Sequence, residues 1–198
     1  MDLADFLRVQ VRANRLANRR LHAAMAPLTR AELHAPRIGF FPSLIETLNH
    51  VLSVDQYYTC ALYGEPDGAS HWARFVPADD LPALSECQRV CDERLIAFCD
   101  ALDAAGCARG VAMDRGEGRV QHDCVANVLA HVAMHQTHHR GQLHAMLSAT
   151  AVAPPQLDEF LMPSEAHFRV ADMAALGWDE REVFGPVGMT AKTAPTAD

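Results

Sequence analysis

The 198-residue sequence predicts an all-α protein, a four-helix bundle with a short β-ribbon or loop before its last long helix. Four long segments carry apolar residues at the spacing of an α-helix. Capping residues, prolines and glycines mark the ends of these segments. A single long connection, between the second and third segments, is typical of bundles that contain a crossover.

The first helix is predicted from about residue 3 to residue 27, because apolar residues recur there at helical spacing. Four arginines follow one another along it at steps of four, three and four: Arg8, Arg12, Arg15 and Arg19. The ordinary interpretation of such a stripe is a solvated helix face with its charges outward, and an anion site is the alternative.

The second helix is predicted to begin near Ser43, which forms a capping-box pattern with Glu46, and to end at Gly64. Residues 65–79 are expected to form a crossover loop, because prolines and glycines interrupt them. The third helix is predicted from about residue 81 to residue 102, again on helical spacing.

Residues 111–123 precede the last long helix and contain Gly116 and Gly118, so they predict a small β-ribbon or an irregular connection. The last long helix is predicted from Cys124 to Ser148. The chain is thereby divided into a bundle over residues 1–162, a C-terminal helical extension over 163–186 and a disordered tail over 187–198.

Composition excludes several classes of protein. The formal net charge of −8 disfavours binding to nucleic acid, and no apolar run is long enough to cross a membrane. The N-terminal residues lack the apolar core of a secretory signal, so we expect a cytoplasmic protein. The six cysteines form no C-x-x-C pair, and in that compartment we expect them to be reduced.

Eleven histidines are many for a chain of this length, and several lie in the last long helix. His135 and His139 stand four residues apart, which places both side chains on one face of a helix. Two imidazoles at that spacing can reach one metal ion. The pair therefore indicates a metal site, and core histidines satisfied by hydrogen bonds are the alternative.

A third ligand has to come from another helix, and His50 is the best candidate. Apolar residues flank His50 on the inward side of the second helix, where an unsatisfied imidazole would be costly. His131 lies one turn before His135 and forms a rival pair with it. Gln136 stands where a zinc protease of the H-E-x-x-H type has its glutamate base, so protease chemistry by that route is unexpected.

Three segments of the chain resemble the DinB-like (DinB/YfiT) superfamily, many of whose members are classed as metal-dependent enzymes without a demonstrated activity. They are ANRRL at 17–21, FFPSLIETLNHVLSVDQYY at 40–58, and HVAMHQTHHRGQLHAML with the following PPQLDEFL within 131–161. The likeness covers roughly residues 3–162, and its most specific part is the H-x-x-x-H-R-G-Q signature together with a single histidine on the second helix.

This resemblance implies a bundle in up-down-down-up order and a homodimer. It also implies that His50, His135 and His139 hold a zinc or nickel ion and leave positions open on it. The chain beyond residue 162 lies outside the resemblance, and the sequence leaves open whether that region covers the site or serves the dimer.

Two kinds of function follow from the resemblance. The first is a metal-dependent hydrolase or thiol-dependent transferase of unknown substrate, in which the ion activates water or a low-molecular-weight thiol. The alternative is a non-catalytic metal-binding stress-response protein or a dimeric interaction protein. No catalytic base is assigned. The residues expected beside the ligands are His131, Asp55, Arg140 and Gln142.

Overall fold

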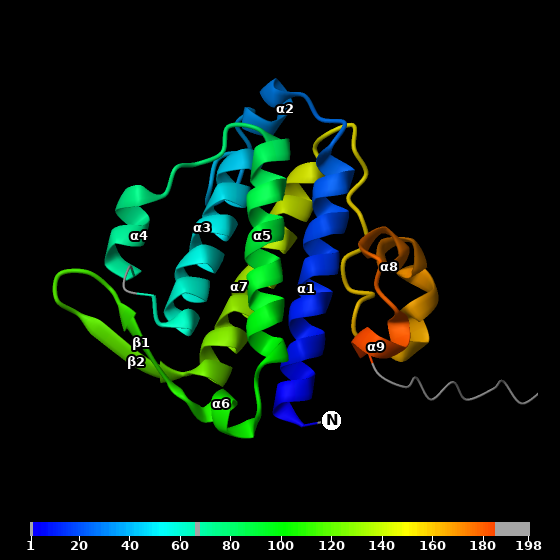
Figure 1. Ribbon diagram of the computed structural model, residues 1–198. Helices are drawn as coiled ribbons and strands as arrows, with labels where there is room; N and C mark the ends of the chain where they lie inside the picture. Colours follow the sequence, from blue (N-terminus) through cyan, green and yellow to red (C-terminus); the bar gives the residue numbers. More distant parts are fainter. Residues whose placement is uncertain (1, 66–67, 185–198) are drawn as a thin grey trace, which may run out of the picture.

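The computed structural model describes residues 2–65 and 68–184, and four long helices form its body (Figure 1). These helices are α1 (Leu3–Met25), α3 (Leu44–Tyr63), α5 (Leu81–Asp100) and α7 (Val125–Leu147). Helices α1 and α3 each pack against both α5 and α7. In the view of Figure 1, the chain ascends in α1 and α7 and descends in α3 and α5.

Short elements connect and extend the long helices. They are α2 (Arg30–His34), α4 (Gly68–Arg74), α6 (Ala104–Ala108), a 3-10 helix η1 (Pro163–Phe168), α8 (Val170–Leu176) and α9 (Glu180–Phe184). The expected crossover loop therefore contains a helix, α4, which packs against α3. An aromatic contact anchors it, because the rings of Trp72 and Tyr57 stack with centroids 5.1 Å apart.

The capping signals read from the sequence form at both ends of α3. The backbone N–H of Glu46 donates to the hydroxyl of Ser43 at 3.3 Å, and that hydroxyl donates to the Glu46 carboxylate at 2.8 Å. Gly64 ends the helix with φ of 71°, a left-handed conformation that glycine adopts without strain. These caps fix where α3 begins and ends, and so where its side chains lie along the bundle.

The predicted β-ribbon is confirmed as an antiparallel hairpin of β1 (Gly110–Asp114) and β2 (Val120–Cys124). In its register, Gly110 pairs with Cys124 and Asp114 with Val120. Alternate side chains of β1, Val111 and Met113, are buried. The hairpin leads directly into α7 and packs against the end of α3 (Figure 1).

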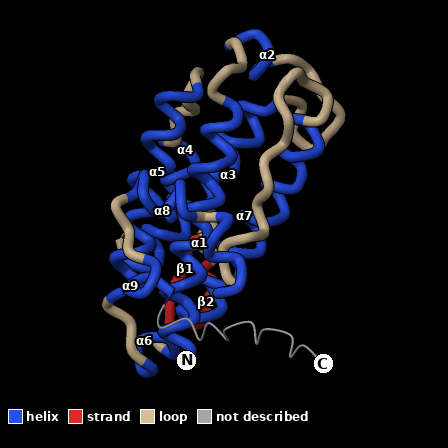
Figure 2. The backbone as a smooth tube through the Cα atoms, turned by 90° about the vertical axis from the view of Figure 1, so that its right-hand side faces the viewer, coloured by secondary structure: helices blue, strands red, loops and turns tan. Residues whose placement is uncertain are grey.

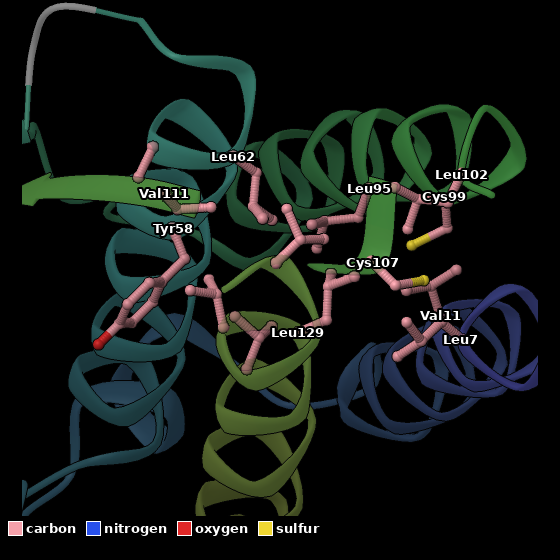
Figure 3. Close-up of a cluster of buried hydrophobic side chains, with 14 of the residues drawn as sticks. Leu7, Val11, Tyr58, Leu62, Leu95, Cys99, Leu102, Cys107, Val111 and Leu129 are labelled. Carbon is pink, nitrogen blue, oxygen red and sulfur yellow. The ribbon is translucent and has the colours of Figure 1, made fainter. Parts of the chain in front are cut away.

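The apolar interior is divided along the length of the bundle. One cluster fills the lower half of Figure 1, where all four long helices meet the hairpin (Figure 3). Cys99 and Cys107 belong to this cluster, and all six cysteines of the chain are free thiols. A second cluster, which includes Leu48, Leu84 and Leu143, fills the upper half beneath α2. Buried polar residues lie along the bundle as well.

The arginine stripe of α1 is not a solvated face, so that prediction is wrong. Arg15 is 7% exposed, and the other three arginines are only partly exposed. Arg12 pairs with Asp100 of α5 at 2.8 Å, and Arg19 pairs with Asp172 of α8 at 2.9 Å. Sequence periodicity could not reveal these partners, because both lie far away along the chain.

The C-terminal extension lies alongside α1 (Figures 1 and 2). Leu16 of α1 packs in a third apolar cluster with Phe160, Met173 and Phe184. Arg169 is fully buried, and its guanidinium pairs with Glu180. Residues 185–198, which include the tail expected to be disordered, lie outside the described residues. No helix within the described ranges is both long and apolar enough to cross a membrane.

Candidate metal centre

Three histidine rings converge between α3 and α7. His135 and His139 stand one turn apart on α7, and their ring centroids are 4.4 Å apart. His50 approaches from the first half of α3, with its centroid 5.0 Å from that of His135 and 4.6 Å from that of His139. The packing of α3 against α7 therefore brings together three residues that are up to 89 positions apart in the sequence.

The donor atoms fit a single small cation. One ring nitrogen from each histidine lies within 4.8 Å of the others, and the two Nε2 atoms of His50 and His135 are 3.0 Å apart. Tetrahedral coordination at a metal–nitrogen distance near 2.05 Å separates ligand nitrogens by about 3.3 Å. Small rotations of the rings would produce that spacing. Among the described residues, this is the single cluster of histidines, cysteines and carboxylates of that kind.

The three imidazoles are held in the neutral form that binds metals. Burial, with the neighbouring His139, lowers the pKa of His50 to about 4. Burial, with the surrounding histidines, lowers the pKa of His135 to about 3. The pKa of His139 is also lowered, chiefly by burial. At neutral pH each ring therefore keeps a lone pair that can be donated to a cation.

Hydrogen bonding distinguishes the two nitrogens of the His139 ring. Its Nδ1 lies 2.8 Å from the side-chain oxygen of Gln142, one turn further along α7. An amide oxygen can only accept, so Nδ1 carries the proton and Nε2 is free to bind a cation. Gln142 in turn contacts Nε2 of the exposed His138 at 3.1 Å. Of the residues expected beside the ligands, Gln142 is the one that forms a hydrogen bond with a histidine of the cluster.

His135 has no comparable partner. Its Nδ1 is buried and forms no hydrogen bond with any residue in the described ranges, while its Nε2 faces the ring of His50. Buried polar atoms are normally satisfied, so this ring is poorly explained as an ordinary core histidine. A cation bound between the three rings would account for the close approach of the Nε2 atoms of His135 and His50.

Phe41 covers the cluster from the loop before α3. Its ring centroid lies 4.3 Å from that of His50 and 5.9 Å from that of His139. Phe40 packs edge-to-face on Phe41 and is itself 82% exposed. An apolar cover of this kind keeps bulk water from one side of the site and lowers the local dielectric constant. The sequence analysis did not single out either phenylalanine.

His131 lies beside the cluster rather than in it. Its ring centroid is 6.2 Å from that of His135 and 5.0 Å from that of Tyr58, and its side chain is exposed. The rival pair of His131 and His135 therefore lacks a third histidine, whereas His135 and His139 have His50. His131 sits one helical turn from the cluster, on the side towards the hairpin.

Asp55 and Arg140 belong to a polar network inside the bundle. Asp55 is fully buried and accepts hydrogen bonds from Gln88 at 2.8 Å and from Gln136. Burial, with the nearby charge of Asp92, raises the pKa of Asp55 to about 8. The hydrogen-bond partners of Asp55 are therefore members of this network and not the three histidines.

Arg140 completes this network from α7. Its guanidinium donates to the side-chain oxygens of Asn18 at 3.0 Å, Gln136 at 3.0 Å and Asn14. Asn18 also donates to Asp92 of α5, so the network joins all four long helices. The sequence analysis missed its members on α1 and α5, although polar residues four apart within apolar helices are a signal for such a network.

Comparison with known proteins assigns this sequence to a family. No curated protein matches the chain. A family model does match, over residues 4–173, and that range takes in the three histidines, all four long helices and part of α8. The model is that of the DinB family. Because the match covers far more than half of the chain, the protein belongs to the DinB family.

Proposed function

We propose that this protein is a metal-dependent enzyme whose divalent ion, zinc or nickel, is held by His50, His135 and His139. The observation that carries the proposal is the convergence of three neutral imidazoles from two helices. The described residues contribute no fourth histidine, cysteine or carboxylate to the cluster. Three protein ligands with an open position are typical of catalytic sites, whereas structural zinc sites are closed by four.

The residues around the cluster would have different roles at such a metal site. Three neutral ligands leave the ion its full charge, so it would supply Lewis acidity, polarising a carbonyl group or lowering the pKa of a water or thiol. Gln142 orients the ring of His139 through Nδ1. Phe41 covers the rings of His50 and His139 and excludes water from that side.

The reaction proposed is hydrolysis or transfer to a low-molecular-weight thiol, on a substrate that is not identified. His131 is the candidate for a proton acceptor, because it is exposed and its ring lies one turn from that of His135. The proposal also takes the four long helices to form the up-down-down-up bundle implied by the family, which agrees with their directions in Figure 1.

Metal analysis of untagged protein tests the proposal. Mass spectrometry should find about one zinc or nickel ion per chain in the wild type, and His50→Ala, His135→Ala and His139→Ala should each lose it. His144→Ala, on the same helix but outside the cluster, is the matched control and should keep its metal. Wild-type protein that binds neither ion after incubation with both would refute the proposed site.

Turnover separates an enzyme from a non-catalytic metal-binding protein. The metal-loaded wild type is screened with thiol and water as acceptors, against the metal-free protein and His135→Ala. Metal-dependent consumption of a thiol or an ester identifies the enzyme. A loaded protein that is inactive across the panel, and whose metal only raises its melting temperature, supports a non-catalytic role in metal binding or stress response.

A further inference from the structure

A cavity lies away from the three histidines and is lined by residues of α1, α2 and α5 and of the loops beside them. Figure 1 shows the upper ends of α1 and α5 with α2 above them. Its volume is about 570 Å³, within the range of small-molecule sites. None of the three histidines lines it. The lining residues lie within the range matched by the family model. They include none of the proposed metal ligands, so the cavity is separate from the metal centre.

Two buried polar side chains of α1 face this cavity without a hydrogen-bond partner. Arg15 and His22 are seven residues apart, on one face of the helix, and are 7% and 9% exposed. The one ion pair of Arg15 within the described ranges is with Asp92 at 3.9 Å, too long for a hydrogen bond. Neither side chain forms a hydrogen bond with a described residue. Because both residues line the cavity, an acceptor group that enters it can bond to both donors.

The other charged residues around the cavity already have partners. Arg19 pairs with Asp172, Arg30 with Asp79 and Arg89 with Glu86, at distances from 2.5 to 2.9 Å. Asp80 caps α5 by accepting a hydrogen bond from the backbone of Ala83 at 2.8 Å. Among the lining arginines, Arg15 has the longest ion pair, 3.9 Å to Asp92, so its guanidinium keeps donors that a ligand can use.

The remaining walls are apolar and lie next to this charge. They are formed by Ala23, Ala26, Leu28, Leu33, Leu81 and Pro82. A ligand that fills the cavity must bury apolar surface against these walls and present an anionic group to Arg15. A purely polar anion such as inorganic phosphate would leave most of these walls uncovered.

We propose that this cavity binds a small organic carboxylate with an apolar body, the carboxylate pairing with Arg15 and accepting a hydrogen bond from His22. A planar guanidinium matches a carboxylate through two parallel hydrogen bonds, which provides both affinity and orientation. His22 is neutral, because burial and nearby arginines lower its pKa to about 4, and one ring nitrogen then donates. This proposal does not depend on the metal-dependent activity.

Calorimetric titration of the full-length protein with 4-phenylbutyrate, and with the uncharged 4-phenylbutyramide, tests the proposal. The acid should bind at least about tenfold more tightly than the amide, because the amide cannot form the charge-assisted pair with Arg15. Arg15→Met should remove this preference. Arg12→Met is the matched control: Arg12 belongs to the same stripe, pairs with Asp100 and does not line the cavity.

Two further variants test whether binding occurs in this cavity and whether it is independent of the metal centre. Ala23→Trp fills the cavity from an exposed position without touching Arg15, so it should abolish binding while helicity and melting temperature stay near wild type. His135→Ala, which damages the metal centre, should bind the acid as the wild type does. The inference is overturned if acid and amide bind alike, if neither binds, if Ala23→Trp still binds, or if His135→Ala loses binding.

Discussion

Gln142 decides which nitrogen of His139 is available to a metal ion. The contact of 2.8 Å between its side-chain oxygen and Nδ1 fixes both the tautomer and the orientation of the ring. Without that contact the ring can turn, and Nδ1 competes with Nε2 for the proton. The same glutamine is held by His138, so its orientation is itself constrained.

Replacing this glutamine tests its role. Gln142→Leu should raise the dissociation constant of the metal about 10- to 100-fold, because His139 loses the group that orients it. Competition with a chelator of known affinity measures the change. Gln10→Leu, on α1 and outside the cluster, should leave the affinity unchanged. Equal affinities for wild type and Gln142→Leu would mean that the packing of the ring suffices to orient it.

Asp55 gives the stability of the fold a pH dependence with a defined sign. Its pKa is about 8 in the folded protein, against about 3.9 in an unfolded chain. The folded protein therefore retains a proton that the unfolded chain releases. The favourable contribution of this carboxyl group is complete below about pH 4 and is lost as the pH rises towards 8.

Asp55→Asn should remove this dependence. Asparagine stays neutral and still accepts the hydrogen bonds from Gln88 and Gln136. Urea unfolding of both proteins between about pH 5 and pH 8 should show a difference in unfolding free energy that grows in favour of the variant as pH rises. Comparing the two proteins cancels the opposite trend of the buried histidines, whose lowered pKa values destabilise the fold in acid. Parallel curves would show that Asp55 is ionised in the folded state.

At the scale of single elements, the N-cap of α3 stabilises the start of the helix that carries His50. Ser43 satisfies the backbone N–H of Glu46, and His50 follows two turns later on the same helix. Fraying of the first turn would loosen the loop that carries Phe41 before it would move His50. The cap therefore acts on stability more than on the geometry of the three rings.

Ser43→Ala should lower the unfolding free energy by about 1 kcal/mol, the usual cost of losing an N-cap. Metal content at neutral pH should not change, because six residues of helix separate the cap from His50. Urea unfolding and metal analysis measure the two quantities. Ser148→Ala provides the control, since the hydroxyl of this exposed serine at the end of α7 donates to the backbone oxygen of His144 in its own helix. A variant that loses its metal would place the cap in direct support of the site.

At the scale of the whole molecule, the C-terminal extension and the three histidines lie on different helices. The extension packs against α1, whereas the histidines belong to α3 and α7. As far as residue 184, the extension therefore packs on α1 and not on the helices that carry the histidines. Its ion pairs with α1, such as Arg20 with Asp172 at 2.6 Å, attach it to the bundle.

We propose that the homodimer implied by the family uses the seam between α1 and α7. An apolar groove of about 490 Å³ lies there, and the rim side chains Leu3, Phe6 and Met134 are 52%, 44% and 74% exposed. Burying such side chains against a second copy is favourable. Met134→Glu should convert a dimer to a monomer in light scattering, whereas Ile38→Glu, fully exposed on the loop before α3, should not. A wild-type monomer at all concentrations would refute the dimer.

The sequence by itself determined the local structure of this protein. Apolar spacing and caps predict the four long helices, because a helix is specified by residues three and four apart. Glycines predict the turn of the hairpin, where Gly116 and Gly118 adopt positive φ. The spacing of His135 and His139 predicts that they share a face, and their rings are indeed adjacent.

Tertiary structure decided everything that depends on distant partners. His50 meets the α7 histidines, rather than standing alone as a core histidine, because α3 packs against α7. Arg15 is buried because α5 covers that face of α1, so two arginines of a stripe predicted to be solvated, Arg15 and Arg19, line a cavity instead. Periodicity shows which face of a helix a residue occupies, but only packing determines what covers that face and whether its charges find partners.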